Sequence, residues 1–338
     1  MGTVDGGKIA SMNPPRVRIV TPALAAANNG NAHTAARWQH FLSPLARVDV
    51  ALDWQGEALD AMIALHARRS ADSIARFHAA HPERPLAVVL TGTDLYRDLP
   101  GDASAQNSLR CASHLVVLQE EALRRLDAGM RSKARCIVQS ATHIVRKDKS
   151  QCTVDLVAVG HLRPEKDPLT LMRAACALPS DSTVRVMQIG NPLDEALADA
   201  ARRSMAECAH YRWLGGLPAG ATRDCIARAH ALVHASLMEG GANVVVEAVR
   251  SRVPVLASRI DGNVGLLGAD YDGYFPVGDA GALAALMQRF AAEPAFAAHL
   301  AGQCARREPL FTPEAEAAAV KGLLHDMLAH HATIESPQ

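Results

Sequence analysis

The chain has 338 residues, of which 49% are hydrophobic, 21% charged and only 4% aromatic. This length is typical of two domains, and the apolar fraction can fill a core in each, which excludes a disordered chain and a small disulfide-held scaffold. Lys plus Arg and Asp plus Glu both total 35, so the formal net charge is zero. A general nucleic-acid-binding protein usually carries a basic surplus, so the balance argues against a nucleic-acid partner.

The seven cysteines are an odd number at wide spacings, and no Cys-x-x-Cys pair occurs. This usage is typical of small buried thiols in a reducing compartment, so we expect a cytoplasmic protein. No segment approaches ~18 uninterrupted apolar residues, so we expect no membrane span. Residues 1–11 lack the pattern of a signal peptide, and we expect a flexible extension there, with Met12 as a candidate original start.

In the first half of the chain, short β-rich runs alternate with helical runs. The predicted elements in chain order are a strand over 16–20, a helix over 32–42, and strands over 48–52, 61–65, 86–90, 115–118 and 136–138. Repeated alternation of strand and helix predicts parallel pairing through right-handed crossovers.

After a polar linker at 146–151, the alternation starts again. The predicted strands are 154–159, 184–189, 232–235 and 253–257, and the predicted helices are 168–178, 193–208, 222–229, 243–251 and an Ala-rich helical stretch from 281 to about 331. We therefore predict an α/β fold of two doubly wound Rossmann-like domains that face each other across a cleft, with helices at the C-terminus. Such sheets bind ligands at the carboxyl ends of their strands.

The strongest functional signal is the segment EGGANVVVE, which begins at Glu239 and ends at Glu247. Glu239 lies in the loop after a predicted strand, and Glu247 lies inside the next helix. Gly240 and Gly241 allow a ligand to approach the backbone, and the free amides of a helix start favour phosphate. The two carboxylates can accept hydrogen bonds from a ribose diol and from sugar hydroxyls. The structural alternative is a glycine turn with two solvated glutamates.

This segment resembles the E-x7-E motif of the GT4-type glycosyltransferases, which have the GT-B fold. The resemblance implies that Glu239 contacts the sugar of an activated donor and acts in catalysis, and that Glu247 holds the nucleotide ribose. It also implies that the backbone at Gly240, Gly241, Ala242 and Asn243 binds the donor and stabilises the departing nucleotide.

A second segment, GHLRPEKDP, follows the first strand of the second half and resembles the family's G-R-L-x-x-E-K segment. In the family, the Arg and the Lys neutralise the donor diphosphate. Lys166 matches the family Lys, whereas His161 stands at the Arg position and is at best half-charged near neutrality. Arg163, two residues further on, is the alternative catalytic cation.

Other donor-side candidates are Gly262 and Asn263, for which turn formation is the alternative. The resemblance implies no cofactor beyond the donor itself and no metal, because GT-B enzymes stabilise the leaving group with protein cations and helix ends. The Asp-x-Asp sequence at Asp270 and Asp272 lies among glycines and is interpreted as a turn. The fifteen histidines show no metal-binding spacing.

The first half contains the expected acceptor side. A loop rich in asparagine precedes the first predicted helix, and two basic side chains follow it one helical turn apart. An amide-rich cradle for an anion and simple loop geometry are both compatible with this pattern. The candidate acceptor-binding residues here are Asn28, Asn29, Gly30, Asn31, His33 and Arg37.

The segment TGTDLY, which begins at Thr91, ends the clearest strand of the first half and resembles the family's acceptor-side loop. Thr93 is a further acceptor-binding candidate. Asp94 is the candidate general base if the acceptor is a hydroxyl, and an N-cap aspartate is the alternative.

Three segments together resemble one branch, the selenosugar synthases of selenoneine biosynthesis: RIVTPALAAANNGNAHTAARWQHFL, TGTDLYRDL and EGGANVVVEA. The resemblance implies a UDP-sugar donor (UDP-GlcNAc or UDP-glucose), selenophosphate as acceptor, a carbon–selenium bond in the product, and other enzymes of the pathway as partners. We also predict an acceptor domain over 12–148, a donor domain over 149–310 and a final helix over 311–338 that crosses back to the first domain.

Selenophosphate is an anion with a soft nucleophilic selenium, so it needs little help from a general base. It does need a second anion site beside the diphosphate, lined with cations and amides. Two alternatives remain open on the sequence: a GT4 enzyme with a hydroxyl acceptor, for which Asp94 would be essential, and a nucleotide-sugar-binding protein without turnover.

Overall fold

The computed structural model describes residues 13–24, 30–145 and 147–334. The flexible extension expected at 1–11 and the candidate residues Asn28 and Asn29 lie outside these ranges. No helix within them is both long and apolar enough to cross a membrane.

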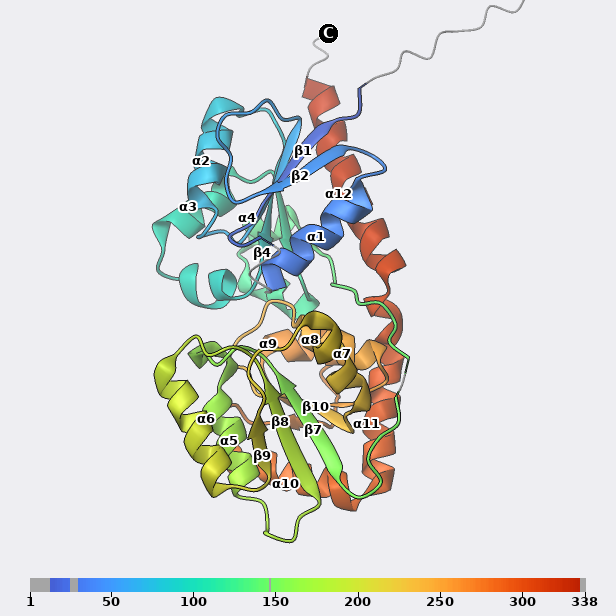
Figure 1. Cartoon of the computed structure of the whole chain (residues 1–338). Coiled ribbons are helices and arrows are strands. Elements are labelled where there is room, and N and C mark those ends of the chain that lie inside the picture. Colours follow the sequence, from blue (N-terminus) through green and yellow to red (C-terminus); the bar gives the residue numbers. More distant parts are fainter. Residues whose placement is uncertain (1–12, 25–29, 146, 335–338) are drawn as a thin grey trace, which may run out of the picture.

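The described residues form two parallel sheets stacked end to end (Figure 1). The first sheet has the spatial order β2 (Arg47–Ala51), β1 (Arg16–Val20), β3 (Ala61–Leu65), β4 (Leu86–Leu90), β5 (His114–Val117) and β6 (Ala134–Cys136). Its helices and helical turns are α1 (Gly30–Leu42), α2 (Ala71–Ala80), η2 (Asp94–Asp98), α3 (Ala103–Cys111), η3 (Glu120–Arg125) and α4 (Ala128–Ser132).

The second sheet has the order β12 (Tyr274–Phe275), β11 (Val255–Ser258), β10 (Ala231–His234), β7 (Val154–Val159), β8 (Val184–Ile189) and β9 (Tyr211–Trp213). Its helices and helical turns are η4 (Pro164–Lys166), α5 (Pro168–Cys176), α6 (Glu195–Glu207), α7 (Ala219–Arg228), α8 (Asn243–Arg250), α9 (Asp261–Leu267), α10 (Ala280–Ala292), α11 (Pro294–Arg307) and η5 (Glu308–Phe311). The last helix along the chain is α12 (Pro313–Ile334). All strand pairs are parallel, which confirms the predicted doubly wound α/β fold.

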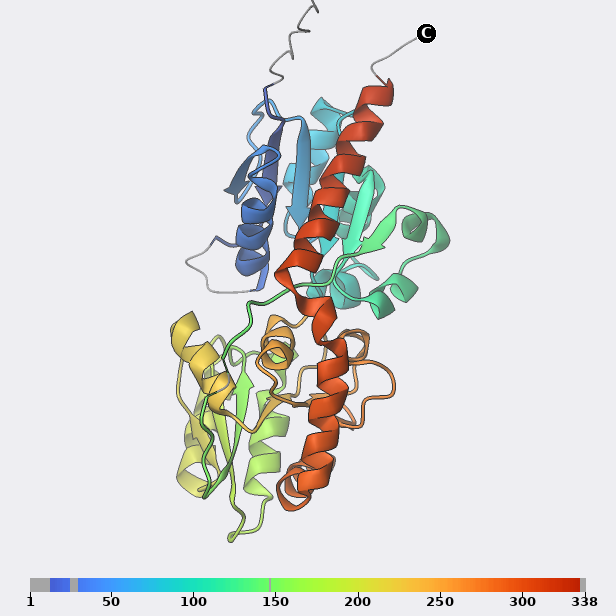
Figure 2. The same ribbon diagram turned by 90° about the vertical axis from the view of Figure 1, so that its right-hand side faces the viewer.

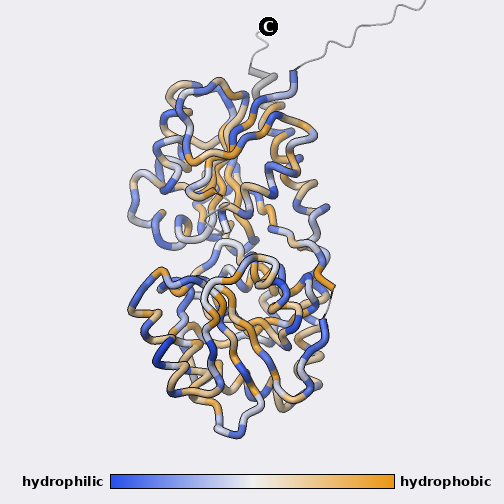
Figure 3. Tube along the Cα trace, in the orientation of Figure 1, coloured by the Kyte–Doolittle hydropathy of each residue, from blue (hydrophilic) through white to orange (hydrophobic). Residues whose placement is uncertain are grey.

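The central strands are apolar on both faces because helices cover both sides of each sheet. In β3, the side chains of Ala61 and Ile63 pack on the core beneath α1 and α12, whereas Met62 and Ala64 pack on the core beneath α2 and α3. Hydrophobic segments accordingly run through the middle of both sheets, with hydrophilic segments outside (Figure 3). The continuous apolar runs of the sequence are thus explained by burial on two faces.

The last helix, α12, packs beside α1 on the first sheet (Figure 2), although it follows the second domain in the chain. One carboxylate on α12 fixes this position. Glu316 is 1% exposed, and it accepts hydrogen bonds from the Trp38 indole at 2.9 Å, from the Arg37 Nε at 3.0 Å and from the backbone N–H of Ser140 at 2.7 Å. A buried carboxylate needs such partners, so Glu316 ties α1 and the chain between the sheets to α12.

We predict that Glu316→Ala lowers the free energy of unfolding by about 3–5 kcal/mol, because it leaves the buried Trp38 and Ser140 donors and the Arg37 charge without their acceptor. Urea denaturation measures the change. Glu314→Ala, on an exposed position of the same helix, is the matched control and should change it by less than about 0.5 kcal/mol. Equal stabilities of the two variants would contradict this role of Glu316.

Candidate active site between the two sheets

The carboxyl ends of the strands in the two sheets face each other (Figure 1). In each sheet the strand order reverses at one position, the switch point. The reversal lies between β1 and β3 in the first sheet and between β7 and β10 in the second. Ligands of doubly wound proteins bind at such switch points. Gly160 follows β7 and the loop that contains Glu239 follows β10, so the two signature segments of the sequence meet at the second switch point.

The loops after β4 and β10 touch through their backbones. A Cβ atom at Gly240 would lie 2.4 Å from the carbonyl carbon of Thr91, and one at Gly92 would lie 2.6 Å from the Gly240 nitrogen. Gly92 also has a φ of +126°, which side chains disfavour. A Cβ at Gly241 would clash with Leu118. The absence of side chains at Gly240 and Gly241 therefore lets the first half of the chain approach this loop, and donor binding by their backbone stays a prediction.

Asp94 organises the β4 loop from the inside. Its fully buried carboxylate accepts four backbone N–H bonds: Oδ1 lies 2.9 Å from the Thr91 nitrogen, 2.8 Å from the Gly92 nitrogen and 3.0 Å from the Leu95 nitrogen, and Oδ2 lies 3.0 Å from the Ala67 nitrogen. Its lone pairs face the protein backbone, and this arrangement favours the structural alternative, an aspartate that caps the turn, over the general-base prediction.

We predict that Asp94→Ala lowers the free energy of unfolding by about 3 kcal/mol or more, because four backbone donors lose a charged acceptor. Thermal and urea unfolding measure the loss, and Asp72→Ala at an exposed position of α2 is the control. If Asp94→Ala had wild-type stability but no catalytic activity, that result would instead support Asp94 as a general base.

Lys166 and Glu239 form an ion pair across the second switch point, so the structure brings together the two strongest candidates of the sequence. His234, which is 3% exposed at the end of β10, lies 3.5 Å from the same Glu239 oxygen. Burial alone would raise the pKa of Glu239, but the Lys166 charge and the His234 hydrogen bond outweigh it and hold this pKa below its ordinary value. Glu239 is therefore a carboxylate at neutral pH.

His234 is held in turn by a residue that the sequence assigned to the donor. Asn263 is fully buried; its Oδ1 lies 2.9 Å from the His234 Nδ1, and its Nδ2 donates to the Ser258 carbonyl at 2.8 Å. Gly262 is buried against the backbone carbonyl of Glu239. In this structure the two residues support Glu239 through His234 and through the loop backbone, and their direct contact with a donor stays a prediction.

Glu247 lies in α8 and is half-buried, and no described residue donates a hydrogen bond to its carboxylate. Burial raises its pKa above the ordinary value, and the charges of Arg223 and Arg37 only partly offset this. A carboxylate in such surroundings is a good acceptor for hydroxyl donors of a ligand. Two amide oxygens close to the start of α8, Gln139 Oε1 and Asn243 Oδ1, are buried without a hydrogen-bond partner among the described residues. Buried polar atoms of this kind call for a polar ligand or water.

The remaining donor-side candidates differ in charge. His161 accepts a hydrogen bond from the Asn191 nitrogen at its Nδ1, 3.1 Å away, which requires that this nitrogen be unprotonated. Arg163 has a buried Nε without a hydrogen-bond partner in the described chain, and its nearest carboxylate oxygen, on Glu165, is 3.9 Å away. Arg163 and Lys166 are therefore the cations available for a diphosphate. Ala242, the last of the donor-side candidates, is buried directly before the start of α8.

On the acceptor side, Gly30 and Asn31 begin α1, and Gly30 lies close to the Asn243 side chain of the second half. His33 is on the exposed face of the helix, and Thr93 is half-buried at the β4 loop. Arg37 pairs with Glu316 on α12, and its role in acceptor binding stays a prediction.

Sequence reasoning missed the ion pairs that join the two halves. Arg97 of η2 contacts Glu165, the neighbour of Lys166, at 2.5 Å, and Arg125 contacts Asp261 at 2.6 Å. It also missed His66, a buried histidine directly after β3 with a φ of +74°. A histidine immediately after an apolar strand was the available signal, because that position lies at the carboxyl edge of the sheet.

Within the described ranges, no group of three or more His, Cys, Asp and Glu side chains is arranged to hold a metal. Asp272 of the Asp-x-Asp sequence pairs with His299, 2.7 Å away, on the outer side of the second domain.

Residues 143–306 match the family model of the glycosyl transferases group 1. Solved structures with a similar fold include HepE of Anabaena in complex with UDP and glucose (TM-score 0.73, 14% identity, 92% of this chain and 99% of that chain). Another is sucrose-phosphate synthase of Thermosynechococcus elongatus (TM-score 0.74, 14% identity, 94% and 100%). TarM of S. aureus, in complex with UDP, aligns with a TM-score of 0.63 at 16% identity over 79% of this chain, which spans about half (55%) of TarM. These likenesses show that the chain has the GT-B fold, and the match to the group 1 model lies in its second half.

We predict that Lys166→Met raises the pKa of Glu239, because the ion pair is the larger of the interactions that lower it. A carbon-detected NMR titration of the Glu239 carboxyl measures the shift. A pKa depressed in the folded state means that the pair stabilises the protein above the ordinary glutamate pKa of about 4.3 and that this contribution fades as the pH falls. Lys147→Met, which removes an exposed pair with Asp224, should leave the Glu239 titration unchanged.

Proposed function

We propose that this protein transfers a sugar from a UDP-sugar, UDP-GlcNAc or UDP-glucose, to selenophosphate and forms a selenosugar with a carbon–selenium bond. The observation that supports the UDP-sugar donor is the ion pair of Lys166 with Glu239 at the second switch point, with Glu247 in the helix that follows, all within the residues that match the group 1 model. The fold neighbour HepE was solved with UDP and glucose, which supports the same donor class here.

Each part of the UDP-sugar has a protein side chain suited to bind it. The carboxylate of Glu247, free of internal hydrogen-bond donors, accepts from the ribose diol. Lys166 and Arg163 provide positive charge for the diphosphate, and Glu239 turns to the sugar hydroxyls when Lys166 turns to phosphate. The resulting exchange of partners keeps every buried charge paired, as a buried site requires.

In the proposed reaction, the selenium of selenophosphate attacks the anomeric carbon of the sugar. The carbon–selenium bond forms as the bond between that carbon and the diphosphate oxygen breaks, and the electron pair leaves on UDP. The selenium–phosphorus bond stays intact, so the product of this step is a selenosugar that still carries the phosphoryl group on selenium. Lys166 and Arg163 stabilise the charge that develops on UDP. No proton has to be removed from the nucleophile. This suits a site in which Asp94 is committed to four backbone amides, and it favours selenophosphate over a hydroxyl acceptor.

Incubation of the protein with UDP-GlcNAc or UDP-glucose and selenophosphate tests the proposal. Mass spectrometry is expected to find UDP together with a selenium-bearing sugar. Glu247→Ala should reduce kcat/KM about 10–100-fold, because it removes charged hydrogen bonds to the ribose. Glu195→Ala, at an exposed position of α6, is the control.

The other outcomes separate the alternatives. If UDP is released only when a hydroxylated acceptor is present, the acceptor substrate is a hydroxyl compound and not selenophosphate. Binding of the UDP-sugar without release of UDP would make the protein a non-catalytic binder.

A further inference from the structure

A second set of functional groups surrounds His66, at the switch point of the first sheet. His66 directly follows β3, which lies beside β1 where the strand order reverses. Its ring is 2% exposed and its backbone has a φ of +74°. Residues held in the left-handed region concentrate at functional sites, where the surroundings offset the strain.

The contacts of the imidazole fix its tautomer. Nδ1 accepts a hydrogen bond from the Arg69 backbone nitrogen, 3.3 Å away, and Nε2 lies 3.0 Å from the Thr93 hydroxyl oxygen. Burial and the Arg69 charge lower the pKa of His66, while Asp94 at 3.9 Å from Nδ1 and Asp98 at 4.0 Å from Nε2 oppose the shift. The net pKa is lowered, so the ring is neutral near pH 7, with its proton on Nε2.

This tautomer orients the hydroxyl of Thr93. Because Nε2–H donates to Thr93 Oγ1, the hydroxyl proton is left to point at another group. Thr93 is half-buried on the loop that meets Gly240 of the second half. Thr93 therefore offers a hydrogen-bond donor at the junction of the two halves.

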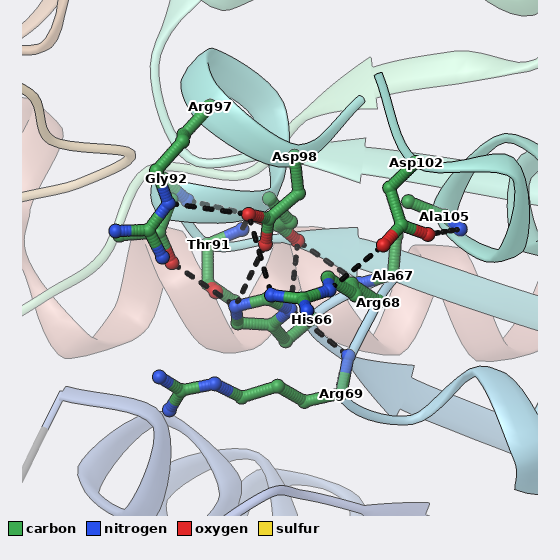
Figure 4. Close-up of polar contacts among 12 residues, drawn as sticks. His66, Ala67, Arg68, Arg69, Thr91, Gly92, Arg97, Asp98, Asp102 and Ala105 are labelled. Atoms are coloured by element: carbon green, nitrogen blue, oxygen red, sulfur yellow. Dashed lines mark hydrogen bonds and ion pairs between the residues drawn. The ribbon is translucent and has the colours of Figure 1, made fainter. Parts of the chain in front are cut away.

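Two successive arginines follow His66, and they differ in their partners. Arg68 pairs with Asp102 at 2.8 Å and with Asp98 at 3.7 Å. Arg69 is exposed, and no carboxylate among the described residues pairs with its guanidinium. Figure 4 shows Arg69 extending on the side of His66 away from Asp98 and Asp102, whereas Arg68 reaches toward both. Arg69 is thus an unneutralised cation directly beside the switch point.

We propose that Arg69 and the Thr93 hydroxyl, oriented by His66, form a subsite for a phosphate-like oxyanion: the acceptor of the transfer reaction. This inference rests on the proposed function for the identity of the reaction. Arg69 supplies the charge and a bidentate fork for two anion oxygens, and Thr93 supplies a neutral donor to a third. His66 is a positioning residue, since it acts through Thr93 and through the Arg69 backbone.

The test measures orthophosphate binding by calorimetry in the presence of saturating UDP, which fills the diphosphate subsite. Arg69→Met is expected to raise the Kd for orthophosphate at least tenfold, and Arg69→Lys to give an intermediate value. Arg68→Met is the matched control and should change this Kd less than twofold. The affinity for UDP should be unchanged in all three variants.

Two further variants test the orientation of the hydroxyl. Thr93→Val removes the donor at constant shape, and His66→Asn retains a residue that tolerates positive φ. Both should raise the KM for selenophosphate several-fold while the KM for the UDP-sugar stays constant, a split that a general loss of structure would not produce.

Failure of the inference can be told apart from failure of the proposed function. If the wild type does not bind UDP, the proposed function fails. If it binds UDP but not orthophosphate, or if Arg69→Met and Arg68→Met bind orthophosphate equally well, the oxyanion subsite is overturned.

Discussion

The contact between Gly92 and Gly240 is the constraint on which the site depends, because it brings two loop backbones closer than any side chain allows. Each loop is shaped from behind by a buried polar group: Asp94 holds the first through four amides, and the ion pair of Lys166 with Glu239 holds the second. The carboxyl edges of both sheets therefore face each other at a fixed register. Ion pairs at Arg97 and Arg125 brace this contact at its margins.

The charges in this junction divide into those that hold the protein and those that remain for ligands. Arg37, Arg68 and Arg97 each lie against carboxylates of the protein, whereas Arg69 has no such partner in the described chain. Lys166 is intermediate, since its partner Glu239 is itself a proposed sugar contact. The proposed reaction brings two anions together, and this requires cations on both sides of the reacting bond. Arg69 in the first half and Lys166 with Arg163 in the second meet that requirement from opposite sheets.

Hydrophobic runs were enough to predict most strands and the two-domain fold, because apolar burial on two faces leaves a local pattern. The two-residue strand β12 left no such pattern. Lys166 and Glu239 were recognised because each stands in a motif that follows a predicted strand, and the topology brings those two connections to one edge of the sheet. The contacts of Arg37 and Asn263 could not be predicted because their partners are distant in sequence: Glu316 lies on the last helix, and His234 ends another strand. The sequence shows that a side chain is polar, but only the fold shows which polar groups satisfy one another.

The commitment of Asp94 to the backbone also constrains the chemistry. A hydroxyl acceptor has a high pKa and reacts fast only if a base removes its proton during attack. The carboxylate best placed by sequence for that task has its lone pairs directed at four amides, and protonating it would break the turn that holds Gly92 against Gly240. An acceptor that arrives already ionised avoids this conflict. It demands a fixed cation and a fixed hydrogen-bond donor, and Arg69 and Thr93 have these properties on the two sides of His66.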